Sequence, residues 1–310
     1  MDYQLNEDQN ALVDSLNSIL QRYRDPAQDD RLSYSYFQAD LRQTLEEGGF
    51  FDAAEAMGTL EAALVAIECA RIPGVVEAAA STLVAPHLVP GETLPGPIAL
   101  VASRDLGKAI RNLPIAKTLI VDTGDDVVVL AVDPAGVEEV KTIFAYPYGT
   151  LTTPPDLASG RRLGAAARAK LLLWWRLALA ADMAGSAQAA VAFTSDYVKE
   201  RHVFGKPLGA LQAVQHRLAQ CYQISRAMYY LCLRAAWGAD PQLADVAINY
   251  AQQHIHKLVF DLHQFNGGMG VTCEHKLHFW TYRLRALQAE SGTVDDTALA
   301  IADRAWGVAD

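Results

Sequence analysis

The second half of this 310-residue chain carries helical periodicity almost to its end, and this feature constrains the fold most. Glycine and proline fall mainly at the joints between the periodic stretches, where helices begin and end. The stretches lie near residues 164–201, 208–237, 242–265 and 294–307. Four long helical segments in succession predict a four-helix bundle for residues 164–310.

The first ninety residues are also helical in pattern. Leu12, Leu16 and Leu20 repeat every four residues, and an Ala/Leu-rich run over 60–71 stops at a Pro-Gly pair. Residues 1–92 are therefore predicted to form a small helical N-terminal domain.

Short β-type runs separate the two helical parts. They cover residues 98–101, 118–121 and 127–132, and a Gly-Asp-Asp turn lies between the last two. Residues 93–163 are predicted to be a compact β-rich domain. The chain as a whole is thus predicted to be mainly α with a small β-domain.

Charge and hydropathy exclude several classes of protein. Lys and Arg number 26 against 36 Asp and Glu, a net charge of −10, so no basic surface is expected for nucleic acid. The longest apolar stretches end well short of the roughly 20 residues that span a bilayer. Glu7 and Asp8 lie where a secretory signal would be cationic and then apolar. We expect a cytoplasmic protein with no membrane segment.

Two motifs carry a family resemblance. Residues 197–208 read Y-V-K-E-R-H-V-F-G-K-P-L and precede Gln212, similar to the acyl-CoA dehydrogenase signature Y-x-x-x-R-x-x-F-G-K-P-L…Q. Residues 264–272 read Q-F-N-G-G-M-G-V-T, with Glu274 and then Tyr282-Arg283 further on, and resemble that family's Q-x-x-G-G-x-G-x-T-x-E…Y-R. The resemblance implies the family's fold of N-terminal helical domain, β-domain and C-terminal four-helix bundle.

The residue types in these motifs suit an ADP group. A guanidinium such as that of Arg201 can make a bidentate contact with a pyrophosphate. Gly267 and Gly268 allow backbone N–H groups to approach the same anion with no Cβ between them. Taken one by one, the same residues could instead be an ordinary ion pair and a helix C-cap.

The resemblance also implies a cofactor site shared between subunits. Its residues would contact the ADP half of an FAD whose flavin ring lies mainly in the neighbouring subunit. They are Arg201, Phe204, Gln212, Gln264, Phe265, Asn266, Gly267, Gly268 and, by similarity to the family's G-T loop, Thr293.

The catalytic base of the family has no counterpart here. In the family a glutamate removes the α-proton of the acyl-CoA while a hydride passes to the flavin, and it occupies one of two positions. One position, in the pattern E-G-T, aligns with Ser291, and the other, just before an arginine on the first bundle helix, aligns with Trp175. Glu290 is the fallback base, one residue from the loop position.

The β-domain lacks the family's flavin-binding patterns as well. Neither Q-A-x-T-E-P-x-x-G-S-D nor K-x-W-I-T-N occurs between Pro95 and Arg162. The chain lacks the catalytic base and the flavin loops but retains the ADP motifs. In this combination it resembles the short subunits of α2β2 acyl-CoA dehydrogenases of actinobacteria and related bacteria. The resemblance implies a full-length catalytic partner, two FAD per tetramer, a bulky acyl-CoA substrate such as a steroid fragment, and reoxidation by an electron-transferring flavoprotein.

Two alternatives belong to other classes. The first is a compact dehydrogenase that is active alone through Glu290, and the second is a structural subunit without any FAD contact. No metal site is expected, because His254, His256 and His263 do not reproduce a short HxxxH pair.

Overall fold

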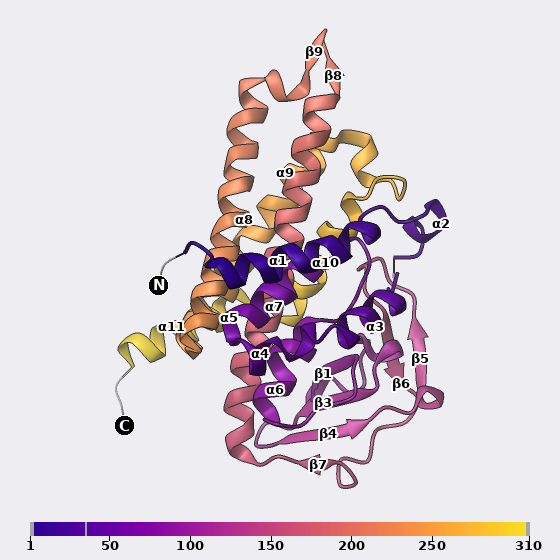
Figure 1. Cartoon of the computed structure of the whole chain (residues 1–310), viewed down its shortest axis with the longest axis vertical. Helices are drawn as coiled ribbons and strands as arrows, with labels where there is room; N and C mark the ends of the chain where they lie inside the picture. Colours follow the sequence, from indigo (N-terminus) through magenta and orange to yellow (C-terminus); the bar gives the residue numbers. More distant parts are fainter. Residues whose placement is uncertain (1–2, 35, 308–310) are drawn as a thin grey trace.

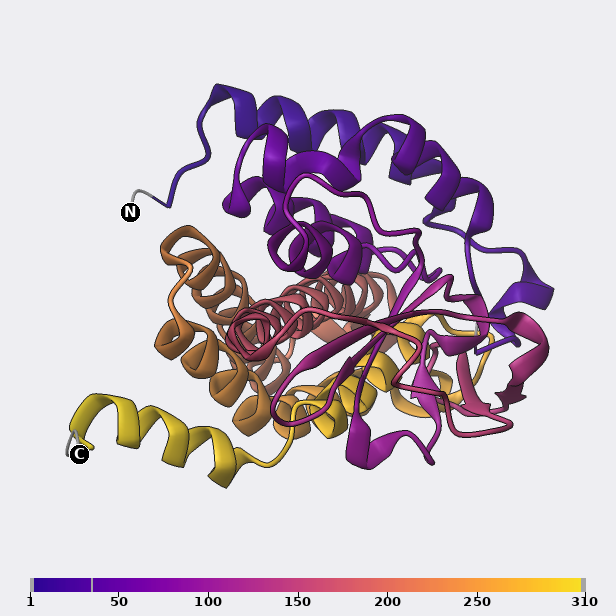
Figure 2. The same ribbon diagram turned by 90° about the horizontal axis from the view of Figure 1, so that it is seen from below.

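The computed structural model describes residues 3–34 and 36–307 of the chain. A bundle of long helices forms its axis, the β-strands lie at one end of the bundle, and a short hairpin caps the other end (Figure 1). The N-terminal helices cover one side of the bundle (Figure 2). The predicted class, mainly α with a small β-domain, is confirmed.

The N-terminal helices form where the leucine and alanine periodicity indicated. A capping box between Asn6 and Gln9 begins α1, whose Leu16 and Leu20 are buried, and α5 is buried along most of its length. These helices and the bundle share one continuous apolar core. The helices are α1 Glu7–Leu20, α2 Gln28–Arg31, α3 Ala39–Glu47, α4 Ala53–Ala56, α5 Thr59–Ala70 and α6 Ala85–Leu88.

The β-rich part contains two small sheets with an apolar core of their own. One sheet has the order β1-β3-β4-β7, with β1 parallel to β3 and Ile98 opposite Thr118, and the other has the order β2-β6-β5. The three predicted strands are confirmed as β1, β3 and β4; the other four were missed because they are short or polar. The strands are β1 Ile98–Ala102, β2 Ile110–Arg111, β3 Thr118–Asp122, β4 Val127–Ala131, β5 Val137–Val140, β6 Tyr148–Leu151 and β7 Arg161–Arg162.

The bundle differs from the sequence prediction in its fourth helix. Helices α7 Ala165–Glu200, α8 Gln212–Gly238 and α9 Pro241–Asn266 match the predicted stretches, but the fourth member is α10, Leu277–Glu290. The last predicted helix, α11 Val294–Trp306, packs on α9 and extends outward as an arm (Figures 1 and 2). Helix α10 escaped prediction because His278, Thr281 and Arg283 are buried in it, which obscures its apolar periodicity.

Helix α7 is the central element of the core. Among the described residues it is the one helix whose length and composition would allow a membrane span, yet 72% of its apolar window is buried inside the fold. Its apolar side chains therefore already have protein neighbours, as is typical of a core helix.

Candidate functional site

Arg201 and Phe204 lie at the end of the bundle, in the hairpin that follows α7. Strands β8 His202–Val203 and β9 Lys206–Pro207 pair across a turn in which Phe204 and Gly205 have φ of 50° and 79°. Positive φ at both central residues is the geometry of a tight hairpin turn, and it is strained for phenylalanine. The ring of Phe204 is nevertheless 95% exposed, so the fold displays a large apolar side chain to solvent at this tip.

Arg201 ends α7 and is free to bind an anion. Its backbone closes the hairpin, because its carbonyl accepts from the N–H of Leu208 at 2.7 Å. Its side chain is exposed and makes no hydrogen bond or ion pair with any residue in the described part of the chain. Gln212, the first residue of α8, is exposed at the same end.

The glycine turn after α9 offers an open backbone surface. Gly267 has φ of 57° and ψ of −146°, a conformation that essentially requires glycine. A Cβ at Gly267 or Gly268 would meet no atom within 4 Å, so an anion can approach these backbone groups. Gln264 is exposed on the preceding turn of α9.

Phe265 and Asn266 differ from the rest of the predicted set, because both side chains are buried. Asn266 Nδ2 donates to Thr194 Oγ1 of α7 at 2.9 Å, which fixes the end of α9 two turns before Arg201. Its Oδ1 is buried and has no partner among the described residues. These two residues therefore hold the glycine turn against α7 and do not present their side chains to solvent.

Thr293 lies away from the other predicted cofactor residues. It is the N-cap of α11 and forms a capping box with Asp296. The segment before it is tied to Gln252 of α9, whose Nε2 donates to the carbonyl of Gly292 at 2.9 Å. Gln252 precedes Asn266 by fourteen residues on the same helix, a separation of roughly 21 Å.

The two candidate base positions converge on one cleft. This cleft, of about 630 Å³, lies between the β-rich part and helices α7 and α10, and both Trp175 and Ser291 line it. Ser291 Oγ donates to the carbonyl of Gln288 and accepts from Gln252 Nε2, each at 3.0 Å. Neither side chain offers a carboxylate to the cleft.

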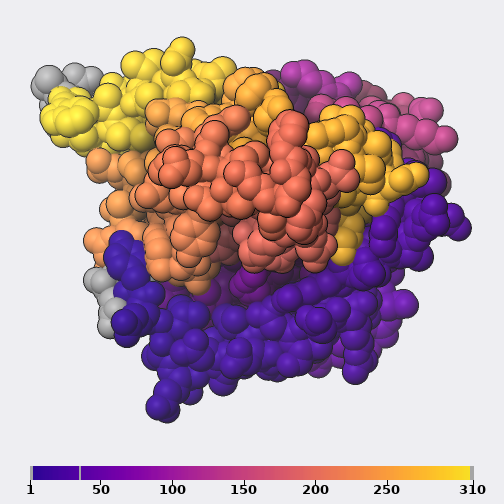
Figure 3. Space-filling model, turned by 90° about the horizontal axis from the view of Figure 1, so that it is seen from above, coloured from indigo at the N-terminus to yellow at the C-terminus, as the bar shows by residue number. Residues whose placement is uncertain are grey.

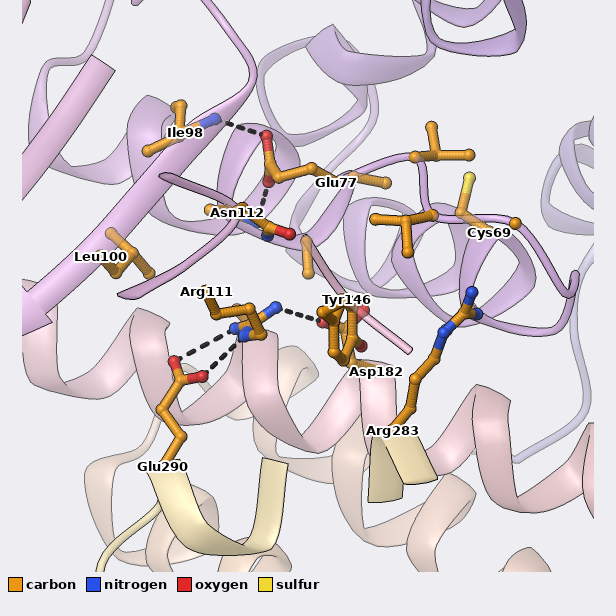
Figure 4. Close-up of a pocket in the computed structure, with 18 residues that line it drawn as sticks. Cys69, Glu77, Ile98, Leu100, Arg111, Asn112, Tyr146, Asp182, Arg283 and Glu290 are labelled. Atoms are coloured by element: carbon orange, nitrogen blue, oxygen red, sulfur yellow. Dashed lines mark hydrogen bonds and ion pairs between the residues drawn. The ribbon is translucent and has the colours of Figure 1, made fainter. Parts of the chain in front are cut away.

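Glu290 is held by three donors. Arg111 of β2 binds it through Nε at 2.6 Å and Nη2 at 3.1 Å, and Trp175 Nε1 donates to its Oε1 at 3.0 Å. Figure 4 shows the carboxylate pointing from α10 toward the guanidinium. Three of its roughly four acceptor positions are thus occupied, which leaves little capacity to take a substrate proton.

Sequence reasoning missed the charged network around Arg111. Asp182 of α7 lies 3.5 Å from Arg111 Nη1, and both border an internal cavity of about 30 Å³ together with Glu77 and Arg283 (Figure 4). Burial raises the pKa of Asp182 to about 7, against the opposing effect of the Arg111 guanidinium. One signal was available: Asp182 and Arg111 are charged residues within otherwise apolar segments.

The structure also positions the histidines considered as metal ligands. No group of three His, Cys, Asp or Glu side chains suited to a metal ion occurs within the described ranges. His254 instead bonds the carbonyl of Tyr250, one helical turn back, and His263 contacts Thr281.

Comparison with known proteins identifies the C-terminal part of the chain. Residues 163–306 match the model of the acyl-CoA dehydrogenase C-terminal domain. Acyl-CoA dehydrogenase IpdE2 of Mycobacterium tuberculosis is 31% identical over 105 residues, 34% of this chain and 33% of that protein. The 3-(aryl)acrylate reductase of Clostridium sporogenes is 30% identical over 138 residues, 43% of this chain and 37% of that one. The matches thus span about a third of these relatives' length.

Solved structures agree over the whole chain. The ChsE4-ChsE5 complex from Mycobacterium tuberculosis contains a chain with a TM-score of 0.79 and 20% identity, and the match covers 100% of both chains. A glutaryl-coenzyme A dehydrogenase gives a TM-score of 0.76 at 19% identity, over 99% of this chain and 98% of that one. The fold is therefore that of an acyl-CoA dehydrogenase. Residues 163–306 thus match the C-terminal domain of the acyl-CoA dehydrogenase family, and the chain as a whole has that family's fold.

Proposed function

We propose that this chain is a non-catalytic subunit of a heteromeric, FAD-dependent acyl-CoA dehydrogenase, and that it supplies the ADP-binding half of its partner's FAD site. The observation that carries this proposal is the distance between Trp175 and Arg201. Trp175 and Arg201 are 26 residues apart on α7, roughly 39 Å along its axis. An extended FAD is shorter than this, so an ADP group at Arg201 cannot belong to a flavin beside Trp175 of the same chain.

The bundle end fits an anionic cofactor group. The Arg201 guanidinium is unpaired among the described residues, and the Gly267-Gly268 backbone is open. A charge-assisted contact from Arg201, N–H donation from the glycine turn and an apolar contact from Phe204 would together bind a nucleotide diphosphate. When bound, FAD supplies the hydride acceptor, and this chain only positions its ADP end.

The cleft of this chain lacks the groups for α-proton removal. Tryptophan and serine occupy the two base positions, and Glu290 is engaged by Arg111 and Trp175. This arrangement disfavours the compact dehydrogenase that would act alone through Glu290. Thr293 follows Gly292, which lines this cleft. We propose Thr293 as a contact only for a cofactor that approaches from outside the chain.

The partner would be a full-length subunit that carries the base and the flavin loops, in an α2β2 assembly. A similar chain occurs in a structure described as the ChsE4-ChsE5 complex, and another in one described as the Tcur3481-Tcur3483 steroid ACAD, at a TM-score of 0.74 and 23% identity. We propose by analogy a bulky, steroid-derived acyl-CoA as substrate, an electron-transferring flavoprotein as oxidant and a cytoplasmic location. We retain 1–92, 93–163 and 164–310 as the proposed domains.

The flavin absorbance of the purified protein tests this proposal. The chain is measured alone and after co-expression with a full-length acyl-CoA dehydrogenase from the same operon. We expect a colourless chain alone and a yellow complex with one FAD per pair of chains. Stoichiometric FAD on the lone chain that is bleached by an acyl-CoA would contradict the proposal and favour Glu290 as base.

The remaining rival is a structural subunit that makes no FAD contact. It also predicts a colourless lone chain and a yellow complex, so absorbance does not separate it from the proposal. Substitution of Arg201 within the complex does, because only a shared half-site makes flavin retention depend on that residue.

A further inference from the structure

His275 lies in the segment that joins the glycine turn, residues 267–271, to α10. Its ring contacts two aromatic side chains of α7 edge-on, Phe193 at 4.7 Å and Tyr197 at 5.2 Å between ring centroids. Edge-to-face contacts of this kind stabilise aromatic pairs beyond the area that they bury. His275 is 9% exposed, so the imidazole is held inside the fold against α7.

The two aromatic residues precede Arg201 on α7. Phe193, Tyr197 and Arg201 follow one another at intervals of four residues, which places them on one face of the helix. The N–H of Arg201 donates to the carbonyl of Tyr197 at 2.9 Å, so the backbone of Arg201 continues the last helical turn. His275 therefore contacts the turns of α7 that carry the unpaired guanidinium.

The glycine turn is attached to α7 at both of its ends. Before the turn, Asn266 donates to Thr194 Oγ1 at 2.9 Å. After the turn, the ring of His275 packs on α7, and the carbonyl of the same residue accepts from His278 Nδ1 at 2.7 Å. The position of the glycine backbone relative to α7 thus depends on one hydrogen bond and one buried ring.

The imidazole acts in this contact through its shape. Its Nδ1 is buried and has no hydrogen-bond partner within the described ranges. Burial lowers the pKa of His275 to about 4, so the ring is neutral at physiological pH. A phenylalanine at this position would keep the ring and leave no buried nitrogen unpaired.

We propose that His275 is a positioning residue of the ADP-binding half-site, because it fixes the glycine turn relative to Arg201 so that both reach one pyrophosphate. The inference rests on the proposed function. A pre-organised site binds its ligand more tightly, since less conformational freedom is lost on binding. Figure 3 shows this end of the molecule, where the salmon hairpin after α7 lies beside the orange-yellow segment after α9.

Amide hydrogen exchange in the lone chain tests this role without a cofactor. His275→Ala removes the ring, and the amides of residues 267–271 should then exchange roughly tenfold faster or more. His275→Phe should exchange within about twofold of the native rate, because it keeps a ring in place. His87→Ala is the matched control, since His87 stacks on Trp174 near the other end of α7 with ring centroids 3.5 Å apart. Native exchange rates in His275→Ala would overturn the proposal.

The complex with the full-length partner gives a second measurement. His275→Ala should weaken FAD binding by roughly 3- to 30-fold, and His275→Phe should restore most of the affinity. Turnover at saturating FAD should stay within about twofold of native, because His275 is expected to touch no reacting atom. His87→Ala should also lose stability but keep native FAD affinity, which separates positioning from a general loss of packing.

Two results in the complex would overturn the proposal. The first is native FAD affinity in His275→Ala, and the second is equal loss of affinity in the alanine and phenylalanine variants. Arg201→Ala in the same assay shows how far the failure extends. If Arg201→Ala weakens FAD binding, only the role of His275 is wrong; if it also binds FAD as the native complex does, the proposed function is wrong as well.

Discussion

The indole Nε1 of Trp175 donates a 3.0 Å hydrogen bond to Oε1 of Glu290. Trp175 occupies one candidate base position, and Glu290 directly precedes Ser291, which occupies the other. Arg111 holds the same carboxylate through two nitrogens. This arrangement links α7, α10 and β2 at the edge of the cleft. We interpret Glu290 as a structural acid that joins the β-rich part to the bundle.

Replacement of Glu290 should lower stability and spare turnover. Glu290→Gln weakens the pairing of a buried guanidinium, and we expect the free energy of unfolding to fall by about 1–3 kcal/mol. Turnover by the complex with its partner should stay within about twofold, since a catalytic base contributes 10² or more. Urea denaturation and steady-state rates measure both quantities, with Glu139→Gln on the exposed strand β5 as control. A hundredfold loss of turnover would contradict this interpretation.

Asp182 should make stability depend on pH below neutrality. Burial raises its pKa to about 7 from an ordinary 3.8, so the folded protein binds a proton that the unfolded chain has lost. This contribution to stability is fully present below pH 3.8 and is lost as the pH rises to about 7. Asp182→Asn removes the titration, so its unfolding free energy should fall less than that of the native chain between pH 4 and 7. Asp14→Asn, at an exposed aspartate, is the control and should follow the native chain. If the curves of unfolding free energy against pH for Asp182→Asn and the native chain are parallel, this account is wrong.

Gly267 and Gly268 should respond differently to alanine. Gly267→Ala forces a side chain into a conformation that only glycine adopts easily, and should cost about 1–3 kcal/mol of stability. Gly268→Ala has open space and no positive φ, so stability should hardly change. Both should reduce the flavin retained by the complex, because a methyl group then lies where an anion would approach. Full flavin retention by Gly268→Ala would exclude contact at this turn.

Periodicity and turn chemistry were enough to predict the long helices and the three apolar strands. They could not predict α10, because His278 and Arg283 are buried there by tertiary contacts: Arg283 binds the backbone carbonyl of Ile72 at 2.8 Å, across 211 positions. The motifs predicted one set of cofactor residues, but sequence alone did not distinguish exposed Arg201 from buried Phe265. It also grouped Thr293 with Asn266, whereas Gln252, which binds the carbonyl of neighbouring Gly292, precedes Asn266 by roughly 21 Å along α9.

The exposed ring of Phe204 should matter to the complex and not to the fold. Phe204→Gly relieves the strain of its φ of 50°, so the lone chain should be as stable as the native chain or more stable by about 1 kcal/mol. The same variant should release flavin from the complex more readily, while Phe204→Tyr, which keeps the ring, should behave as native. Flavin release is followed by absorbance during dilution. Equal release from the glycine and tyrosine variants would place Phe204 outside the cofactor site.

The central claim is that this chain holds the ADP end of a flavin that lies in its partner. The most direct measurement is the FAD content and FAD dissociation constant of the co-expressed complex carrying Arg201→Ala. Arg201→Lys serves as the conservative variant, and Arg234→Ala, on an arginine that stacks on Trp237, serves as the control. Loss of a charge-assisted contact of about 2–3 kcal/mol should weaken FAD binding by roughly 30- to 150-fold in the Arg201→Ala complex. Arg201→Lys should recover part of this affinity, and Arg234→Ala should bind FAD as the native complex does. An Arg201→Ala complex that retains native FAD content and affinity would contradict the shared half-site and leave a structural subunit in its place.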